Sequence, residues 1–320
     1  RGIDKELSSM DGLEKKMKLA DGYTLMHEHV TINLSGVKKD EDCRLNCFEE
    51  TVKEFKSLYG YGVRNILEVT NLGMGRDVGY IRRVSEETGI NILVSTGFYK
   101  EPFLPDCVYR RSVEELASMM EQELTQGIDG QWESAPGDTG MRASVIGESG
   151  TSSRQMTDME QKVFDAVALA AVRTGAPVTT HTTLGTMGAE QADYLIGHGV
   201  RPEDIIIGHM DLSQDVEVIL DVLKRGVNVG FDTVGKLNYC PDSFRAQALK
   251  RIDQEGMLSH VVLSMDITRK SHLKSRAGIG YGYMFEVFIP LLLEVGFTQA
   301  KIDMLLKENP ERILLGRQYD

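Results

Sequence analysis

The chain has 320 residues, of which 41% are hydrophobic and 26% are charged, and its formal net charge is −12. This acidic balance argues against nucleic acid or an anionic membrane surface as a partner, because no excess of lysine and arginine is present to neutralise phosphates. The four cysteines form no Cys-x-x-Cys pair, and no apolar run approaches the roughly 18 residues that a membrane-spanning helix needs. Because the first segment is also too charged for a secretory signal, we expect a cytoplasmic protein.

From Gly22 onward, short β-rich runs alternate with longer segments of helical period. The predicted strands cover residues 24–30, 64–70, 91–98, 143–148, 177–183, 204–210, 228–234 and 260–266. The predicted helices cover residues 48–59, 76–88, 112–126, 158–174, 187–198, 214–225, 242–255 and 283–295. Eight such units indicate an α/β fold of the (β/α)8, or TIM barrel, type. A doubly wound open sheet is the competing fold, but it seldom needs eight units of this regularity.

The domain organisation follows from the same alternation of strands and helices. Residues 1–21 are predicted to be an N-terminal extension, and residues 22–320 a single domain, because no low-complexity linker divides them. The segment 127–142 breaks the alternation, and we interpret it as an insertion before the fourth strand, on the face away from the chemistry. The glycine-containing loop 270–283 is either a lid over the site or an ordinary surface loop.

A His-x-His pair at the end of the first predicted strand is the strongest functional signal. The side chains of His27 and His29 are two residues apart, so a strand directs both to one side. By itself the pair could be an accident of an exposed strand. The active site of a barrel lies at the carboxyl ends of its strands, however, and further metal-ligand residues end later strands. These residues are Glu148 on the fourth strand, His181 on the fifth, His209 on the sixth and Asp266 on the eighth.

Four histidines and two carboxylates are too many ligands for one four-coordinate zinc. They suit two divalent metal ions that are bridged by one carboxylate and one hydroxide, and zinc is the metal we expect. Each residue alone has an ordinary structural explanation, such as a buried polar group or a helix cap. The prediction depends on their occurrence together at equivalent positions.

The motifs around these residues resemble the phosphotriesterase-like branch of the amidohydrolase superfamily, and most closely the bacterial phosphotriesterase homology proteins. The resemblance extends from Gly22 to Asn309. It includes Met26-His-Glu-His29, Gly147-Glu-Ser-Gly-Thr-Ser152, Thr180-His-Thr-Thr183, Gly208-His-Met-Asp-Leu212, Phe231-Asp-Thr-Val-Gly-Lys236, Leu263-Ser-Met-Asp-Ile-Thr-Arg269 and Glu308-Asn-Pro310.

The resemblance implies that His27, His29 and Asp266 hold the more buried metal, and that His181 and His209 hold the more exposed one. Phosphotriesterases proper carry a carboxylated lysine as the bridging ligand on the fourth strand. This chain has Glu148 there, as the homology-protein branch does. Glu148 therefore supplies a bridging carboxylate without any modification. The difference also means that the substrates of the organophosphate enzymes should not be assumed for this chain.

These features predict a metal-dependent hydrolase that attacks an ester bond with a metal-bridging hydroxide, while Asp266 takes and returns the proton. Lys236 and Arg269 follow the seventh and eighth strands, where barrels bind phosphate, and Tyr99 follows the third. Related hydrolases of phosphorylated sugar lactones carry cations at similar positions, which favours a lactone or other carboxylic ester as the small-molecule substrate. A phosphotriester or amide hydrolase and a non-catalytic metal-binding barrel are the alternatives. Relatives also suggest a homodimer.

Overall fold

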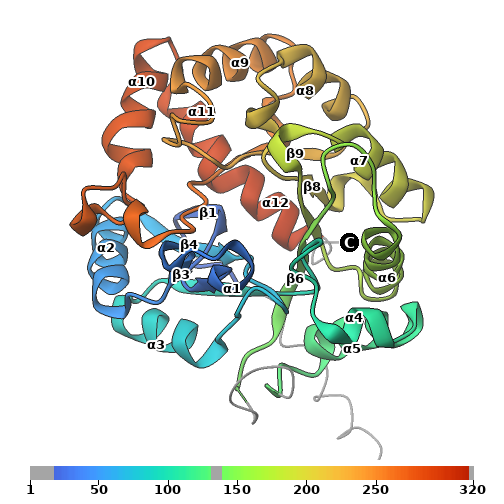
Figure 1. Ribbon diagram of the computed structural model, residues 1–320. Helices are drawn as coiled ribbons and strands as arrows, with labels where there is room; N and C mark the ends of the chain where they lie inside the picture. The colour runs from blue at the N-terminus through green and yellow to red at the C-terminus, as the bar shows by residue number, and fades with distance from the viewer. Residues whose placement is uncertain (1–17, 131–138, 317–320) are drawn as a thin grey trace, which may run out of the picture.

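Eight parallel strands form a nearly closed barrel in the computed structural model, which describes residues 18–130 and 139–316 (Figure 1). They follow one another around the barrel in chain order: β1 (Tyr23–Glu28), β4 (Val63–Glu68), β5 (Asn91–Thr96), β6 (Ala143–Gly150), β7 (Val178–His181), β8 (Ile205–Ile207), β9 (Asn228–Phe231) and β10 (Val261–Leu263). The first and last strands lie in contact, and the Asp266 amide donates to the His27 carbonyl at 3.3 Å. The predicted TIM barrel is confirmed.

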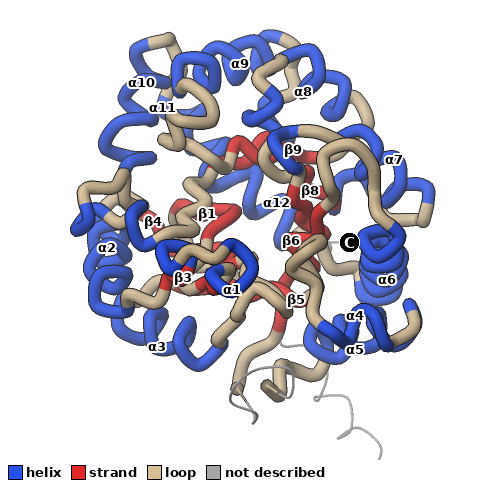
Figure 2. Tube along the Cα trace, viewed as in Figure 1, coloured by secondary structure: helices blue, strands red, loops and turns tan. Residues whose placement is uncertain are grey.

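Helices surround the strands on the outside of the barrel (Figure 2). They are α2 (Phe48–Gly60), α3 (Val78–Thr88), α4 (Asp106–Arg110), α5 (Val113–Thr125), α6 (Asp158–Thr174), α7 (Gly188–Gly197), α8 (Val216–Leu223), α9 (Asp242–Gln254), α10 (Ile289–Glu294), α11 (Gln299–Asp303) and α12 (Asn309–Leu315). Three of these helices, α4, α11 and α12, were not among the predicted helices. In the described part of the chain, no helix is both long enough and apolar enough to cross a membrane.

Apolar side chains fill the inside of the barrel and close it at one end. Six strands contribute to this inner cluster, whose members are Met26, Leu67, Val69, Leu93, Val145, Ile206 and Val262. Ile313 and Leu314 of α12 and the partly buried Leu19 pack against it. The barrel is therefore a packed core and not a pore, and only the end at the carboxyl termini of the strands is left for a site.

Most strands end two or three residues earlier than the sequence predicts, and at β8 and β10 the earlier end places a predicted site residue in the turn that follows. β8 stops at Ile207 and β10 at Leu263, whereas the predicted strands extended to residues 210 and 266. The chain then turns through left-handed backbone conformations, with φ of 56° at His209 and 51° at Asp266. Such conformations are uncommon for residues other than glycine and occur preferentially at functional sites.

The predicted insertion lies partly outside the described residues, because 131–138 are not described. Its two described ends are joined by a hydrogen bond from the Ile128 amide to the Met141 carbonyl, of 2.8 Å. They lead directly into the first residue of β6, at the opposite end of that strand from Glu148. The described part thus agrees with an insertion on the face away from the site.

A short hairpin and a one-turn helix lie near the open end of the barrel: β2 (Ile32–Asn33), α1 (Ser35–Lys38) and β3 (Arg44–Leu45). The loop 270–283 is tied to this region and to α2. Asp42 accepts a hydrogen bond of 2.8 Å from the Ser271 amide, and Glu54 accepts one of 2.7 Å from the Tyr281 amide. Of the two interpretations of this loop, these contacts favour a fixed wall beside the site over a lid.

Candidate metal centre

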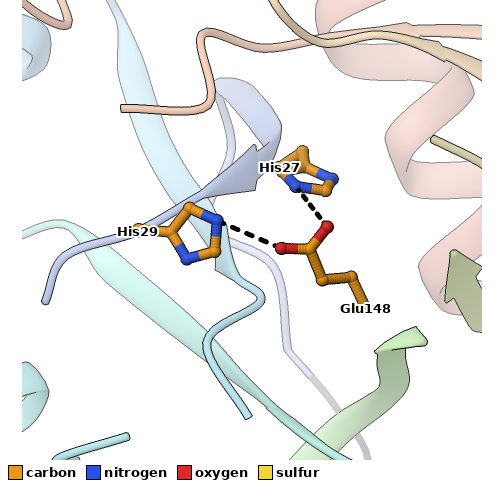
Figure 3. Close-up of side chains that lie close together, drawn as sticks. All are labelled: His27, His29 and Glu148. Atoms are coloured by element: carbon orange, nitrogen blue, oxygen red, sulfur yellow. Dashed lines mark ion pairs between the residues drawn. The ribbon is translucent and has the colours of Figure 1, made fainter. Parts of the chain in front are cut away.

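The six predicted ligand residues converge at the open end of the barrel. Glu148 lies between the two histidines at the end of β1, with its Oε2 3.2 Å from His27 Nε2 and its Oε1 3.3 Å from His29 Nε2 (Figure 3). The same Oε2 is 3.3 Å from His181 Nδ1 and 3.5 Å from His209 Nε2. Glu148 therefore contacts all four imidazoles, which is the position required of a bridging carboxylate.

Asp266 completes the cluster from the side of β10. Its Oδ1 lies 3.2 Å from His29 Nε2 and 3.6 Å from His27 Nε2. Its other oxygen, Oδ2, accepts a short hydrogen bond from the ammonium of Lys236. One carboxylate oxygen thus faces the histidines and the other faces a cation.

The orientation of the imidazoles is fixed by groups behind them. His209 Nδ1 lies 2.6 Å from Asp232 Oδ1, and a carboxylate can only accept, so Nδ1 carries the proton and Nε2 keeps its lone pair. His29 Nδ1 lies 2.7 Å from the hydroxyl of Thr70. That hydroxyl donates its own hydrogen to the Thr31 carbonyl, so it accepts from His29 Nδ1. Both Nε2 lone pairs are consequently directed at the centre of the cluster.

The buried polar atoms without hydrogen-bond partners also indicate a site for a cation. In the described chain they include His27 Nε2, His29 Nε2 and Glu148 Oε2, which are the atoms that point at one another. Leaving such groups unpaired in the interior costs about 1–3 kcal/mol each, and more when they are charged. A divalent cation with nitrogen and oxygen ligands satisfies all three atoms at once, so the donor set fits a metal site.

The electrostatics of the cluster favour added positive charge. Burial alone would lower the pKa of His27, but the charges of Glu148 and Asp232 outweigh burial and raise it. Burial would likewise lower the pKa of His209, and there the charge of Asp232 outweighs burial and raises the pKa. In the same way, Asp266 and Glu148 raise the pKa of His29 to about 10 against the effect of burial. A field that stabilises protons on these imidazoles also attracts metal cations to the same atoms.

The candidate ligands form overlapping groups rather than one set. Among the residues that the structure describes, three groups have ligand atoms within 4.8 Å of one another: His27, His29 and Glu148; His27, His209 and Asp266; and Glu148, His181 and His209. The His181 side chain is 16% exposed, whereas His29 is fully buried. The cluster therefore has a buried half and a half open to solvent, with Glu148 shared between them.

Several buried residues that support the cluster were not identified from the sequence. Asp232 is the most important, and its position directly after β9 is the signal that could have revealed it, because the other candidates also follow strands. Glu68 accepts hydrogen bonds from the amides of Val30 and Thr70, and so joins the segments after β1 and β4. No sequence spacing marks that role.

Glu28, between the two histidines, has a comparable supporting role. It accepts hydrogen bonds from the Ser264 hydroxyl at 2.8 Å and from the Met265 and Ile267 amides at 2.7 and 3.2 Å. These contacts hold the turn that carries Asp266 against β1. The His-x-His segment therefore positions both its own imidazoles and the carboxylate from the other end of the chain.

A cavity of about 420 Å³ opens above the cluster, and the three predicted substrate-binding residues line it. The Tyr99 hydroxyl lies 3.2 Å from the ring nitrogens of His181. Lys236 is bound to Asp266, and the Arg269 guanidinium donates to Asp40 Oδ2 at 2.8 Å. The structure thus brings all three to the cavity, but both cations already contact carboxylates.

Replacing Asp232 by asparagine tests whether it orients His209. Loss of such an outer partner typically weakens metal affinity by about 10- to 100-fold, so Asp232→Asn should do the same in a competition titration with a chromogenic chelator. Asp165→Asn is the matched control, because Asp165 lies 3.7 Å from His198, a histidine outside the cluster. Unchanged affinity in Asp232→Asn would show that the contact is only structural.

Comparisons with known proteins agree with this geometry. Residues 6–314 match the Phosphotriesterase family. The phosphotriesterase homology protein of Escherichia coli is 46% identical over 291 residues, covering 91% of this chain and 97% of that protein. A crystal structure of the E. coli protein, complexed with phosphate in the active site, superposes with a TM-score of 0.87 at 45% identity and covers 92% of this chain and 98% of that one.

More distant relatives carry names of different activities. The phospho-furanose lactonase of Mycoplasmopsis synoviae is 31% identical and covers 92% of this chain and 87% of its own length. The aryldialkylphosphatase of Saccharolobus solfataricus is 29% identical and covers 91% and 94%. These names describe those proteins.

Proposed function

The chain belongs to the phosphotriesterase family, and on this premise we propose that it is a binuclear-metal hydrolase of ester bonds whose substrate is a lactone or another carboxylic ester. The observation that carries the proposal is the cluster of six convergent ligand residues at the floor of a cavity, with buried Nε2 atoms that lack partners. A purely structural polar cluster would pair these atoms with one another or with backbone groups.

The residues divide naturally between two ions. His27, His29 and Asp266 would hold the buried ion, His181 and His209 the open one, and Glu148 would lie between them. Two divalent cations in such a site lower the pKa of water towards about 7 and polarise the carbonyl or phosphoryl oxygen of a substrate. Zinc suits this mixture of imidazole and carboxylate ligands.

Asp266 is the residue we assign to proton transfer. Burial would raise the pKa of Asp266, but Lys236, His29 and the neighbouring imidazoles outweigh burial and hold it well below its ordinary value. The carboxylate is therefore ionised and can accept a proton at Oδ1, the oxygen that faces His27 and His29. It would then deliver that proton to the leaving oxygen of the ester.

The remaining predicted substrate contacts surround this reaction space. Tyr99 would contact a substrate beside His181, since its hydroxyl lies at that imidazole. Lys236 and Arg269 would hold an anionic substituent, such as the phosphate of a sugar lactone. Because both are already bound to carboxylates, they could do so only by sharing their N–H donors between the protein and the substrate.

A comparison of three substrate classes tests the proposed function. Zinc-loaded protein should hydrolyse a sugar lactone, with or without a phosphate, faster than an aryl dialkyl phosphate or an N-acyl amine. A chelator should abolish the activity, and zinc or manganese should restore it. Faster hydrolysis of the phosphate triester or of the amide would show that the ester assignment is wrong. Absence of hydrolysis in all three would favour a non-catalytic metal-binding barrel.

A further inference from the structure

A fully buried arginine lies close to the candidate metal centre, on the side of α9. Arg245 belongs to that helix, its side chain is 0% exposed, and it is not among the residues that line the cavity. A buried guanidinium is costly unless several hydrogen-bonded partners satisfy it. The partners of Arg245 therefore identify the segments that this charge holds together.

The guanidinium joins the segment after β8 to the segment after β9. Its Nε donates to Asp211 Oδ2 at 2.7 Å, and one of its terminal nitrogens donates to the Thr233 hydroxyl at 2.9 Å. That hydroxyl donates its own hydrogen to the same Asp211 oxygen at 2.6 Å. Arg245, Asp211 and Thr233 therefore form a closed triangle of hydrogen bonds, and each of them comes from a different segment of the chain.

The other terminal nitrogen of the guanidinium extends the network to the start of α9. It donates to the Cys240 carbonyl and to Asp242 Oδ1, both at 2.7 Å. Asp242 also accepts a hydrogen bond of 3.1 Å from the Gly235 amide and one of 2.9 Å from the Tyr283 hydroxyl. The network thus fixes the segment between β9 and α9 and ties it to the end of the loop 270–283.

The triangle lies next to the pair that orients a candidate metal ligand. Asp211 follows His209 by two residues, and Thr233 directly follows Asp232. The Asp232 carboxylate accepts from His209 Nδ1 at 2.6 Å and from the His209 amide at 3.0 Å. His209 has a left-handed φ of 56°, and such a conformation persists only where the surrounding contacts hold it. The contact between Asp211 and Thr233 holds the two segments at the spacing that the His209–Asp232 pair requires.

We propose that Arg245 is a positioning residue for the more exposed metal ion. By holding Asp211 against Thr233, it keeps the His209 imidazole directed at the position of that ion. Its own hydrogen bonds go to none of the six candidate ligands, so it acts through the two segments that it joins. The inference rests on the proposed function and assigns part of the metal affinity to a residue outside the ligand set. The buried ion, whose proposed ligands lie at the end of β1 and after β10, should not depend on Arg245.

A stepwise metal titration of the metal-free protein tests this proposal. Zinc that is added in competition with a chromogenic chelator should bind to the unmodified protein in two steps. Arg245→Lys keeps the charge, but an ammonium presents its three donors from one nitrogen and cannot replace the planar guanidinium. We expect Arg245→Lys to weaken the second step about tenfold, the lower end of the range for outer partners of a ligand, and to leave the first step unchanged. Equal weakening of both steps, or of neither, would overturn the proposal.

Two substitutions of Thr233 test the same link without changing any charge. Thr233→Val removes the hydroxyl and should weaken the second step, whereas Thr233→Ser keeps the hydroxyl and should bind both ions as the unmodified protein does. If Arg245→Lys does not fold, this pair decides, and equal affinities of Thr233→Val and Thr233→Ser for the second ion contradict the proposal.

Arg76→Lys is the matched control for Arg245→Lys. Arg76 is also buried, and it donates to Glu123 of α5 at 2.7 Å and to the Ser95 carbonyl of β5 at 3.0 Å. Neither of these elements carries a candidate ligand. Arg76→Lys should therefore leave both binding steps unchanged, and a weaker second step in this variant would show that the effect is not specific to Arg245.

Nuclear magnetic resonance of the metal-free protein separates this inference from the proposed function. The proton between His209 Nδ1 and Asp232 should give a downfield signal in protein with isotope-labelled histidine, and its loss in Asp232→Asn assigns it. In Arg245→Lys the signal should move upfield or broaden, whereas Arg76→Lys should leave it in place. If the zinc-loaded protein hydrolyses no lactone, the proposed function fails, but this signal still decides the inference. A signal that is unchanged in Arg245→Lys contradicts it.

Discussion

Replacing Glu148 by alanine should reduce the metal content from two ions per chain to one or none, and should lower hydrolytic activity by more than about a hundredfold. The estimate is a lower limit, because loss of an outer partner of a ligand already costs about 10- to 100-fold, whereas Glu148 contacts all four imidazoles directly. Elemental analysis of metal-loaded protein and the kcat for a lactone measure the two effects.

Glu148→Gln is the conservative control, because it keeps the shape of the side chain but removes the negative charge. It should retain the fold and still lose metal. Since Glu148 supplies a carboxylate without modification, added bicarbonate should change neither the metal content nor the activity of the unmodified protein. Full activity in Glu148→Ala, or a requirement for bicarbonate, would contradict the assignment of Glu148 as the bridge.

Replacing Asp266 by asparagine should lower kcat by about 10²- to 10⁴-fold, the usual contribution of a positioned acid–base group. The loss should be the same for phosphorylated and unphosphorylated lactones, because Asp266 Oδ1 faces His27 and His29 at the floor of the cavity and not the remote end of a substrate. Rates with saturating substrate, measured after metal loading, provide the comparison.

The metal content of Asp266→Asn distinguishes the two roles of this residue. If both ions are retained and kcat falls, Asp266 transfers the proton. If one ion is lost with the activity, its role as a ligand dominates. An unchanged kcat with both ions bound would remove Asp266 from the chemistry and leave only its contact with Lys236.

The alternation of strands and helices can be predicted from the sequence because each unit repeats the same hydrophobic periodicities. The site can be predicted because the carboxyl ends of parallel strands meet at one end of a barrel. For that reason the sequence alone places His27, Glu148 and His209 together. Helix α12 was missed although it closes the other end of the barrel. The apolar residues of α12 can be recognised as the cover of the barrel core only when the three-dimensional position of that core is known.

The supporting contacts could not be predicted, because they join segments that are far apart in the chain. Glu28 accepts hydrogen bonds from residues 264, 265 and 267, and Arg269 is bound by Asp40. Neither spacing nor composition connects such positions. The charge on Arg269 therefore suggested a free anion site in the sequence, whereas in the structure that guanidinium donates to Asp40.

The proposed function requires two metal ions held by six residues at the strand ends, and the metal content of the purified protein tests this requirement most directly. Protein that has been stripped with a chelator, reloaded with zinc and freed of unbound metal should contain two ions per chain, and activity should return as the second ion binds. One tightly bound ion per chain, with full activity at that content, would contradict the binuclear centre.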